Sequence, residues 1–182
     1  MVRDNWQLFE SVFSPEVCES MIKNFSKLQS VDGTTFNADS DHRRSKVRWV
    51  ENEQAIQNFL LRFVNIANAT AFNVDIQQEM QEMQFGEYDS EYRGKYDWHH
   101  DIDWQNLKHH DRKLSVVVQL SHPDTYEGGE FEFSEVESPN IKQWKKQGSV
   151  LIFPSYLTHR VKEVTSGVRY SLVSWVRGPR WK

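Results

Sequence analysis

The stretch SVLIFPSYLTHRVKEVTSGVRYSLVSWV, residues 149–176, contains three of the segments that decide the fold. Ser149 to Phe153, His159 to Val164 and Arg169 to Val176 are short and rich in β-branched and aromatic residues, and Ser166-Gly167 lies where a tight turn is expected. Segments of this length and composition predict β-strands. This region therefore predicts a sheet built from short, closely spaced strands.

The same pattern extends back to residue 76. Further candidate strands are Met80 to Tyr88, Tyr96 to Asp101, Leu114 to Leu120 and Glu130 to Phe133, with another tight turn at Gly128-Gly129. Helical patterns do not alternate with these strands, which argues against a parallel α/β sheet. We expect a mainly β fold, a double-sheet barrel or jelly roll over residues 76–177, with two N-terminal helices packed outside it.

Two amphipathic helices are predicted before residue 76. Ser14-Pro15 supplies the cap and first turn of one, Asn52 caps the other, and the second ends near Ala71. Between them, the polar stretch 31–48 predicts a mobile loop or a weak hairpin. Residues 1–75 are thus expected to form helical support and a mobile loop within one domain of residues 1–182.

The composition argues against several classes of function. The 182 residues carry a net charge of −4 and no long lysine or arginine run, so nucleic acid and anionic membranes are not expected partners. The chain shows no hydrophobic leader and no apolar run long enough to span a bilayer, which favours a cytoplasmic protein. Cys18 is the single cysteine, so an intrachain disulfide and a cysteine-based zinc site are excluded.

The segment Tyr96-Asp97-Trp98-His99-His100-Asp101 contains a candidate metal site. Alternate residues of a strand point to the same face, so His99 and Asp101 converge and His100 faces away. His159, after a later strand, is a candidate third ligand, although a structural histidine is the common alternative. Two histidines and one carboxylate form the facial triad of non-haem iron(II) sites and leave coordination positions open. Zinc accepts the same ligands, so both metals remain possible at this point.

Arg169 and Ser171 share one face of the last predicted strand and present a guanidinium and a hydroxyl group suited to a carboxylate. A solvated surface pair is the alternative. Trp98, Trp104 and Trp175 are expected to pack rather than to stack on a cofactor; a place in the pocket wall is the alternative for Trp175, which is in register with Arg169 and Ser171. The dry wall of the pocket is expected to come from the strand residues Val150, Ile152 and Leu172 or their neighbours.

In sequence order, residues 80–177 resemble the iron(II)/2-oxoglutarate oxygenases and, within them, the prolyl 4-hydroxylase-like branch. The residues that carry this resemblance are Tyr88, Gly94, Tyr96, His99-x-Asp101, Gly128-Gly129, Phe153-Pro154, His159, Arg169-x-Ser171 and Trp175.

The resemblance implies a double-stranded β-helix whose open end holds iron(II) on the catalytic ligands His99, Asp101 and His159. It implies 2-oxoglutarate as co-substrate, dioxygen, and ascorbate as an optional reductant. It also implies that Arg169, with Ser171, binds the distal carboxylate of 2-oxoglutarate. A tyrosine assists there in this branch. Tyr88 matches best, with Tyr92 and Tyr96 as alternatives because the spacing differs slightly from that of the family.

The implied activity is hydroxylation of an unactivated C–H bond, with a prolyl residue of a peptide or protein as the favoured substrate. Another protein residue or a small metabolite remains an alternative. Two other classes use the same residues differently: a zinc hydrolase with a bound water, and a non-catalytic jelly-roll binding module with structural histidines. The segment Arg44 to Trp49 is similar to one that, in this branch, lies near a loop closing over the substrate; a solvated loop leading to a buried Trp49 is the alternative.

Overall fold

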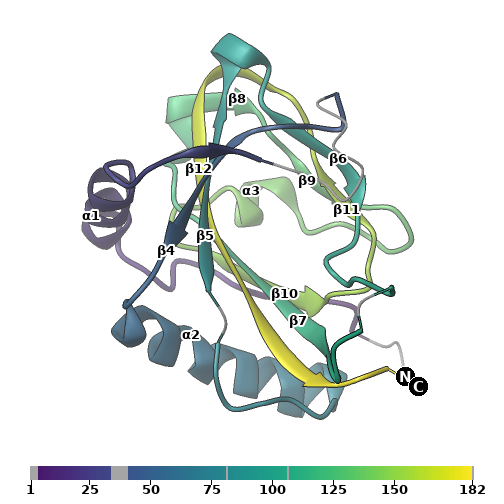
Figure 1. Ribbon diagram of the computed structural model, residues 1–182. Helices are drawn as coiled ribbons and strands as arrows, with labels where there is room; N and C mark the ends of the chain where they lie inside the picture. The colour runs from purple at the N-terminus through teal and green to yellow at the C-terminus, as the bar shows by residue number, and fades with distance from the viewer. Residues whose placement is uncertain (1–3, 34–40, 81, 106, 182) are drawn as a thin grey trace.

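The computed structural model describes residues 4–33, 41–80, 82–105 and 107–181 (Figure 1). Strands supply most of its regular structure, and three α-helices and three short helical turns accompany them. In chain order the elements are β1 (Gln7–Phe9), α1 (Pro15–Phe25), β2 (Val31–Asp32), β3 (Arg43–Arg44), β4 (Lys46–Val50), α2 (Gln54–Ala67), a π-helical turn (Asn68–Phe72), β5 (Met83–Asp89), a 3-10 turn (Ser90–Tyr92), β6 (Lys95–His99), β7 (His110–Gln119), a 3-10 turn (Pro123–Thr125), β8 (Tyr126–Gly128), β9 (Phe131–Phe133), α3 (Ile141–Trp144), β10 (Val150–Pro154), β11 (His159–Val161) and β12 (Val164–Pro179).

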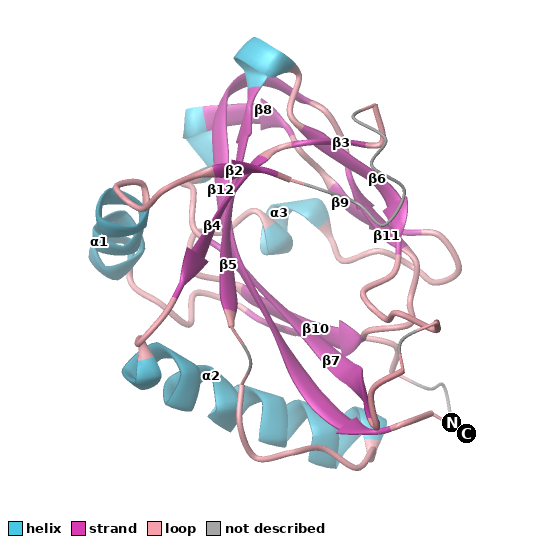
Figure 2. Cartoon of the chain, in the orientation of Figure 1, coloured by secondary structure: helices cyan, strands magenta, loops and turns pink. Residues whose placement is uncertain are grey.

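Two antiparallel sheets form the body of the molecule (Figure 2). The larger has the strand order β1-β10-β7-β12-β5-β4-β2, with β8 paired to β12 outside this path. The smaller has the order β3-β6-β11-β9. Strands distant in sequence are neighbours in both sheets, which is the connectivity of a jelly roll. The predicted fold class is confirmed.

Hydrophobic side chains form separate clusters on the two faces of the larger sheet, because alternate residues of a strand point in opposite directions. One face packs against α1 and α2, which bury Cys18, Met21 and Leu60 among their contacts. The other face carries an aromatic-rich cluster that also includes residues of the smaller sheet. Its buried members are Tyr88, Val117, Tyr126, Phe131, Phe133, Trp144, Leu151, Phe153, Leu157, Val161 and Val164.

Strand β12 is the longest strand of the larger sheet and pairs with β5, β7 and β8. The turn predicted at Ser166-Gly167 is wrong, because both residues lie inside β12. The register against β8 shifts between Val164 and Ser166, and Gly167 has a φ of +67°. A glycine with positive φ serves a β-bulge as well as a turn, and the sequence alone does not distinguish the two.

Both long helices occur close to their predicted positions. Ser14 caps α1 and accepts a hydrogen bond from the backbone N–H of Val17, as predicted. The predicted Asn52 cap of α2 is wrong: Glu53 precedes the helix, and Asn52 has a φ of +62°, a conformation that asparagine tolerates. Val17 is an apolar residue of α1 that is 42% exposed. None of the described helices is both long and apolar enough to cross a membrane.

The polar stretch 31–48 contains β2, β3 and the first residues of β4. Val31 and Val47 are register partners in an antiparallel pair, which agrees with the hairpin alternative. Residues 34–40, which belong to the predicted mobile loop, lie outside the described residues.

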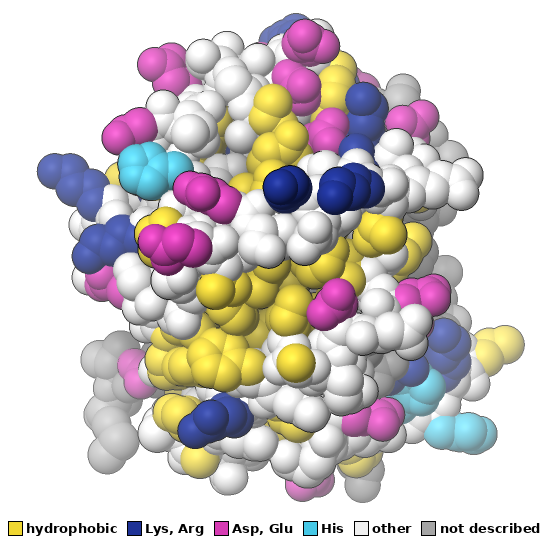
Figure 3. Space-filling model, turned by 90° about the vertical axis from the view of Figure 1, so that its left-hand side faces the viewer, with side chains coloured by type: hydrophobic (Ala, Val, Ile, Leu, Met, Phe, Trp, Pro, Cys, Tyr) yellow, Lys and Arg dark blue, Asp and Glu magenta, His cyan; other side chains and the backbone are white. Residues whose placement is uncertain are grey.

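On the side of the molecule that carries α1, hydrophobic side chains are visible between charged groups (Figure 3).

Candidate metal and anion site

Three predicted ligands come together from two neighbouring strands of the smaller sheet. His99 is the last residue of β6, Asp101 lies two residues further along the chain, and His159 is the first residue of β11 and the register partner of His99. Their ligand atoms all lie within 4.8 Å of one another. The carboxylate oxygens Oδ1 and Oδ2 of Asp101 lie 3.9 Å from Nε2 of His99 and 3.9 Å from Nε2 of His159, respectively.

Backbone carbonyl groups orient both imidazole rings. Nδ1 of His99 lies 2.7 Å from the carbonyl oxygen of Asp97, and Nδ1 of His159 lies 2.9 Å from that of Leu157. Because a carbonyl oxygen only accepts, each Nδ1 donates to it. In a neutral ring, Nε2 is then the nitrogen with the free lone pair, and it faces Asp101. This arrangement is typical of metal-binding histidines, whose other nitrogen is held by a hydrogen bond.

The protonation states of the three residues also suit a cation. Burial raises the pKa of Asp101, but the electrostatic effects of His159, His99 and Arg112 and a hydrogen bond from Ser115 outweigh it and hold the pKa below its usual value. The Ser115 hydroxyl donates to Oδ2 of Asp101 at 2.6 Å. Burial and the proximity of His159 hold the pKa of His99 well below its usual value. At neutral pH the site thus offers one carboxylate and a neutral imidazole at His99.

This donor set fits a divalent transition-metal ion. Two imidazole nitrogens and one carboxylate on one side of a cavity form the facial arrangement of non-haem iron(II) sites, and coordination positions toward the cavity are left open. Zinc would accept the same atoms. The ligand types alone therefore do not choose between the two metals.

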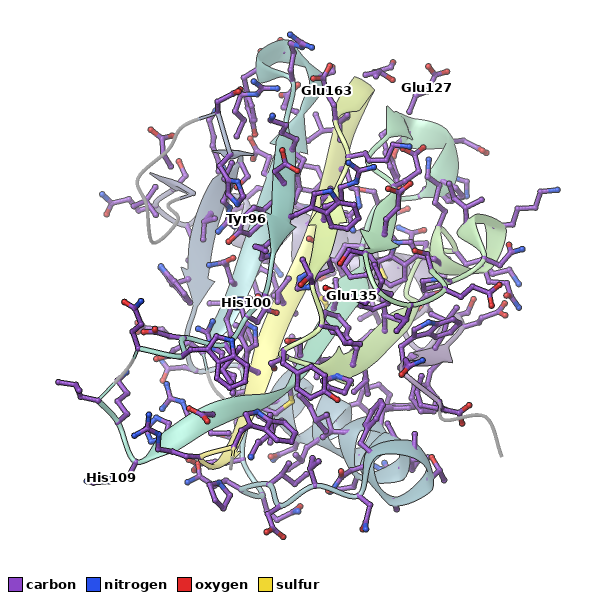
Figure 4. The ribbon with its side chains drawn as sticks, turned by 90° about the vertical axis from the view of Figure 1, so that its right-hand side faces the viewer. Tyr96, His100, His109, Glu127, Glu135 and Glu163 are labelled. Carbon is purple, nitrogen blue, oxygen red and sulfur yellow. The ribbon has the colours of Figure 1, made fainter. Side chains whose placement is uncertain are left out.

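A cavity of about 370 Å³ between the two sheets contains the three ligands. Its lining combines charged, aromatic and aliphatic side chains from both sheets. These residues are Arg43, Trp49, Gln84, Tyr88, Tyr96, His99, Asp101, Arg112, Val117, Phe131, His159, Val161, Arg169, Ser171, Val173 and Trp175. His100, next to a ligand, is not among them, and His109 lies at the periphery of the molecule, far from Tyr96 (Figure 4).

Arg169 places a buried positive charge in this cavity. Its side chain is 1% exposed, and none of its guanidinium nitrogens has a hydrogen-bond partner among the described residues. A buried charge without a partner carries a large desolvation cost, which an anionic ligand would offset. Tyr88, the register partner of Arg169, lies with its ring centroid 5.6 Å from the guanidinium carbon.

Of the other residues predicted to bind the anion, some line the cavity and one does not. Ser171 and Tyr96 line the cavity with Arg169 and Tyr88. Tyr96 stacks on the His99 ring with a centroid distance of 3.4 Å and an interplanar angle of 8°. Tyr92, the further alternative, does not line the cavity; its hydroxyl donates to the carbonyl oxygen of Glu87 at 3.0 Å.

The apolar wall of the cavity is formed by residues other than the three that the sequence predicted. Val150, Ile152 and Leu172 belong to the cluster beneath the helices, so their assignment to the cavity wall is wrong. Val173, which follows Leu172 in β12, and its register partner Val117 on β7 line the cavity instead, together with Phe131 and Val161. Ser171 and Leu172 are consecutive in a strand and must face opposite sides of the sheet.

Two tryptophan predictions are corrected and one agrees with the structure. Trp49 is 44% exposed and lines the cavity, which rules out the buried Trp49 of the solvated-loop alternative. Trp104, expected to pack, is 53% exposed. Trp175 lines the cavity, which agrees with the alternative that its register with Ser171 offered.

Sequence reasoning did not identify Arg112 or Arg43 as part of the cavity. The guanidinium carbon of Arg112 lies 3.6 Å from the ring centroid of Trp175, and the group donates to the carbonyl oxygen of Asp101 at 3.3 Å. Arg43 donates to the side-chain oxygen of Gln84 at 3.0 Å and so links the two sheets across the cavity. Both arginines lie in charged segments of the sequence, and nothing in these segments marks an inward-facing side chain.

Comparison with known protein families gives a match over residues 83–177 to a family described as the 2OG-Fe(II) oxygenase superfamily. Curated relatives include a PKHD-type hydroxylase of Synechococcus sp. (strain CC9311), 41% identical over 88 residues that make up 48% of this chain and 38% of that protein. A PKHD-type hydroxylase of Parvibaculum lavamentivorans is 42% identical over 35% of this chain and 29% of that protein. The matched segments thus span well under half of these relatives.

Solved structures share the fold over nearly the whole chain. The viral collagen prolyl hydroxylase of Paramecium Bursaria Chlorella virus-1, in complex with 2OG, superimposes with a TM-score of 0.71 at 17% identity over 96% of this chain and 97% of that chain. A Trichoplax adhaerens prolyl hydroxylase in complex with a hypoxia inducible factor peptide fragment gives a TM-score of 0.69 at 18% identity over 94% and 83%. At such low sequence identity, these superpositions show similarity of fold alone.

Proposed function

Because the chain belongs to the 2OG-Fe(II) oxygenase superfamily, we propose that it is an iron(II)- and 2-oxoglutarate-dependent dioxygenase that hydroxylates an unactivated C–H bond. One observation carries this proposal: the cluster of His99, Asp101 and His159 shares its cavity with the buried guanidinium of Arg169, which has no hydrogen-bond partner among the residues that the structure describes. The cluster suits the metal and the guanidinium suits the co-substrate. A zinc hydrolase or a non-catalytic jelly roll needs no such buried cation.

In this proposal His99, Asp101 and His159 hold iron(II), and Arg169 binds the distal carboxylate of 2-oxoglutarate beside Ser171 and Tyr88. Bound there, iron(II) supports the oxidation of 2-oxoglutarate by dioxygen to succinate and carbon dioxide, with one oxygen atom transferred to the substrate carbon.

The surrounding residues act by geometry. The carbonyl groups of Asp97 and Leu157 fix the two imidazole rings, and the Tyr96 ring packs on that of His99. Apolar side chains of both sheets, among them Val117, line the cavity and would limit the access of water to a bound substrate.

We propose a prolyl residue of a peptide or protein as the substrate. The curated relatives are named PKHD-type hydroxylases, and one structural neighbour is a prolyl hydroxylase in complex with a peptide fragment. The cavity also has aromatic faces at Trp49 and Trp175, with Arg112 stacked on the latter. Flat indole rings provide apolar surfaces against which a pyrrolidine ring can pack.

To test this proposal, the protein is loaded with iron(II) under anaerobic conditions. 2-Oxoglutarate, dioxygen and a set of proline-containing peptides are then added. We expect succinate to form and the peptide to gain one oxygen atom on a prolyl residue, as located by tandem mass spectrometry. A His159→Ala protein should form neither product.

Three contrary results are possible. Oxygen incorporated into free amino acids or other residues, with none into proline, would replace the proposed substrate and keep the reaction class. Hydrolytic activity that depends on zinc, without succinate formation under any condition, would refute the oxygenase. A His99→Ala protein that turns over at the parent rate would refute the ligand assignment.

A further inference from the structure

A second buried polar group lies directly behind Arg169. Tyr126, on β8, is 4% exposed, and its strand pairs with β12, which carries Arg169. A Cβ atom placed on Gly129 would lie 2.9 Å from Cδ of Arg169 and 3.3 Å from Cε2 of Tyr126. The two side chains therefore pack around the same point. Glycine at this position leaves room for both of them.

Gln119 fixes the direction of the Tyr126 hydroxyl group. Its side-chain nitrogen donates to the Tyr126 hydroxyl oxygen at 3.0 Å and to the carbonyl oxygen of Ser121 at 3.2 Å, and the side chain is 0% exposed. Gln119 is on β7 as the register partner of Ser171, so the rigid centre of the larger sheet anchors this contact.

Tyrosine is chemically well suited to this place. Burial raises the pKa of Tyr126, and the nearby charge of Arg169 opposes that effect without cancelling it. The phenol therefore remains neutral at physiological pH. A neutral hydroxyl oxygen attracts the N–H groups of a guanidinium but leaves its positive charge available to a ligand. An aspartate or glutamate in the same place would neutralise that charge and compete with an incoming carboxylate.

We propose that Tyr126, held by Gln119, is a positioning residue that fixes the Arg169 guanidinium in the orientation that receives the distal carboxylate of 2-oxoglutarate. This inference rests on the role proposed above for Arg169. Arginine has several rotatable side-chain bonds, and immobilising them only on binding would cost conformational entropy. Ordering the group before the ligand arrives removes part of that cost.

The experiment compares Tyr126→Phe with the parent protein, both loaded with manganese(II) so that no turnover occurs. Calorimetric titration with 2-oxoglutarate should give a dissociation constant about 3- to 10-fold higher for Tyr126→Phe, as expected when the guanidinium loses one neighbouring polar group. With iron(II) and peptide, the KM for 2-oxoglutarate should rise by the same factor and kcat at saturation should stay unchanged. Gln119→Leu should shift both quantities in the same direction.

Tyr170→Phe is the matched control. Tyr170 is on the same strand as Arg169 but on the opposite face of the sheet, where it stacks on Phe85 with a centroid distance of 5.4 Å. Tyr170→Phe also removes one hydroxyl group, but it should leave the affinity for 2-oxoglutarate unchanged. Manganese affinity should be equal in all three variants, because none of them alters a metal ligand.

Each contrary outcome has a distinct meaning. If Tyr126→Phe binds 2-oxoglutarate as tightly as the parent, the positioning role is overturned, even if the variant unfolds more easily. If Tyr126→Phe does not fold, the affinity of Gln119→Leu decides in the same way. If the parent itself binds manganese(II) but no 2-oxoglutarate, the proposed function fails together with this inference.

Discussion

Replacing Arg169 by methionine should weaken 2-oxoglutarate binding and stabilise the ligand-free protein. The guanidinium is 1% exposed and has no hydrogen-bond partner among the described residues, so its charge is desolvated without compensation until the co-substrate binds. Truncating one partner of a buried, hydrogen-bonded charge pair costs about 2 to 4 kcal/mol, which corresponds to an about 30- to 900-fold loss of affinity. Methionine keeps much of the apolar stem that packs near Gly129. Removing the unpaired charge should therefore raise the free energy of unfolding by about 1 kcal/mol or more.

Two assays separate these effects. Calorimetric titration of the manganese-loaded protein with 2-oxoglutarate measures the affinity, and urea denaturation of the metal-free protein measures the stability. Arg169→Lys is the matched control: it retains the charge but loses the bidentate geometry, so its affinity should lie between those of the parent and Arg169→Met. An unchanged affinity in Arg169→Met would refute the anchor. A metal-free Arg169→Met protein that is less stable than the parent would show that the guanidinium is mainly structural.

Further predictions concern the metal, the thiol and the backbone. Ser115→Ala removes the hydroxyl that donates to Asp101 at 2.6 Å and should lower manganese affinity about 10- to 100-fold in a competition titration, whereas Ser174→Ala, at another buried serine, should not. Burial raises the pKa of the Cys18 thiol to about 11, so little thiolate is present at pH 8. A thiol reagent should therefore label the native protein far more slowly than the unfolded protein, at a rate that rises toward pH 11. Rapid labelling of the native protein at pH 8 would contradict this. Gly148→Ala puts a side chain at a φ of +79° and against a neighbouring backbone carbonyl, so the free energy of unfolding should fall by about 1 to 3 kcal/mol or more, and an unchanged urea midpoint would speak against this strain.

The sequence predicted the parts of the site that depend on local geometry. His99 and Asp101 are two residues apart on one strand, and Arg169 and Ser171 share a face for the same reason, so strand alternation alone brings each pair together. His159 is different, because its register with His99 depends on strand pairing between distant segments. Its type and its place after an apolar strand made it a candidate, and only the fold brought it to the other two.

Features that depend on long-range packing could not be read from the chain. Leu172 and Val173 are both apolar, and no local signal told which of them faces the helices and which the cavity. Tyr126 precedes Gly128-Gly129, and that motif predicted only a turn. Its position behind Arg169 follows from the pairing of β8 with the bulged start of β12. Trp49 lines the cavity because β4 joins the larger sheet beside β5, and this strand was not predicted.

Anaerobic calorimetric titration of the metal-free protein with iron(II), in the presence of 2-oxoglutarate, tests the central claim most directly. If His99, Asp101 and His159 form one metal centre, binding should saturate at one iron per chain in the parent, and the saturable heat should disappear in His159→Ala. A parent protein that binds no iron, or a His159→Ala protein that titrates like the parent, would contradict the assignment of this cavity as an oxygenase site.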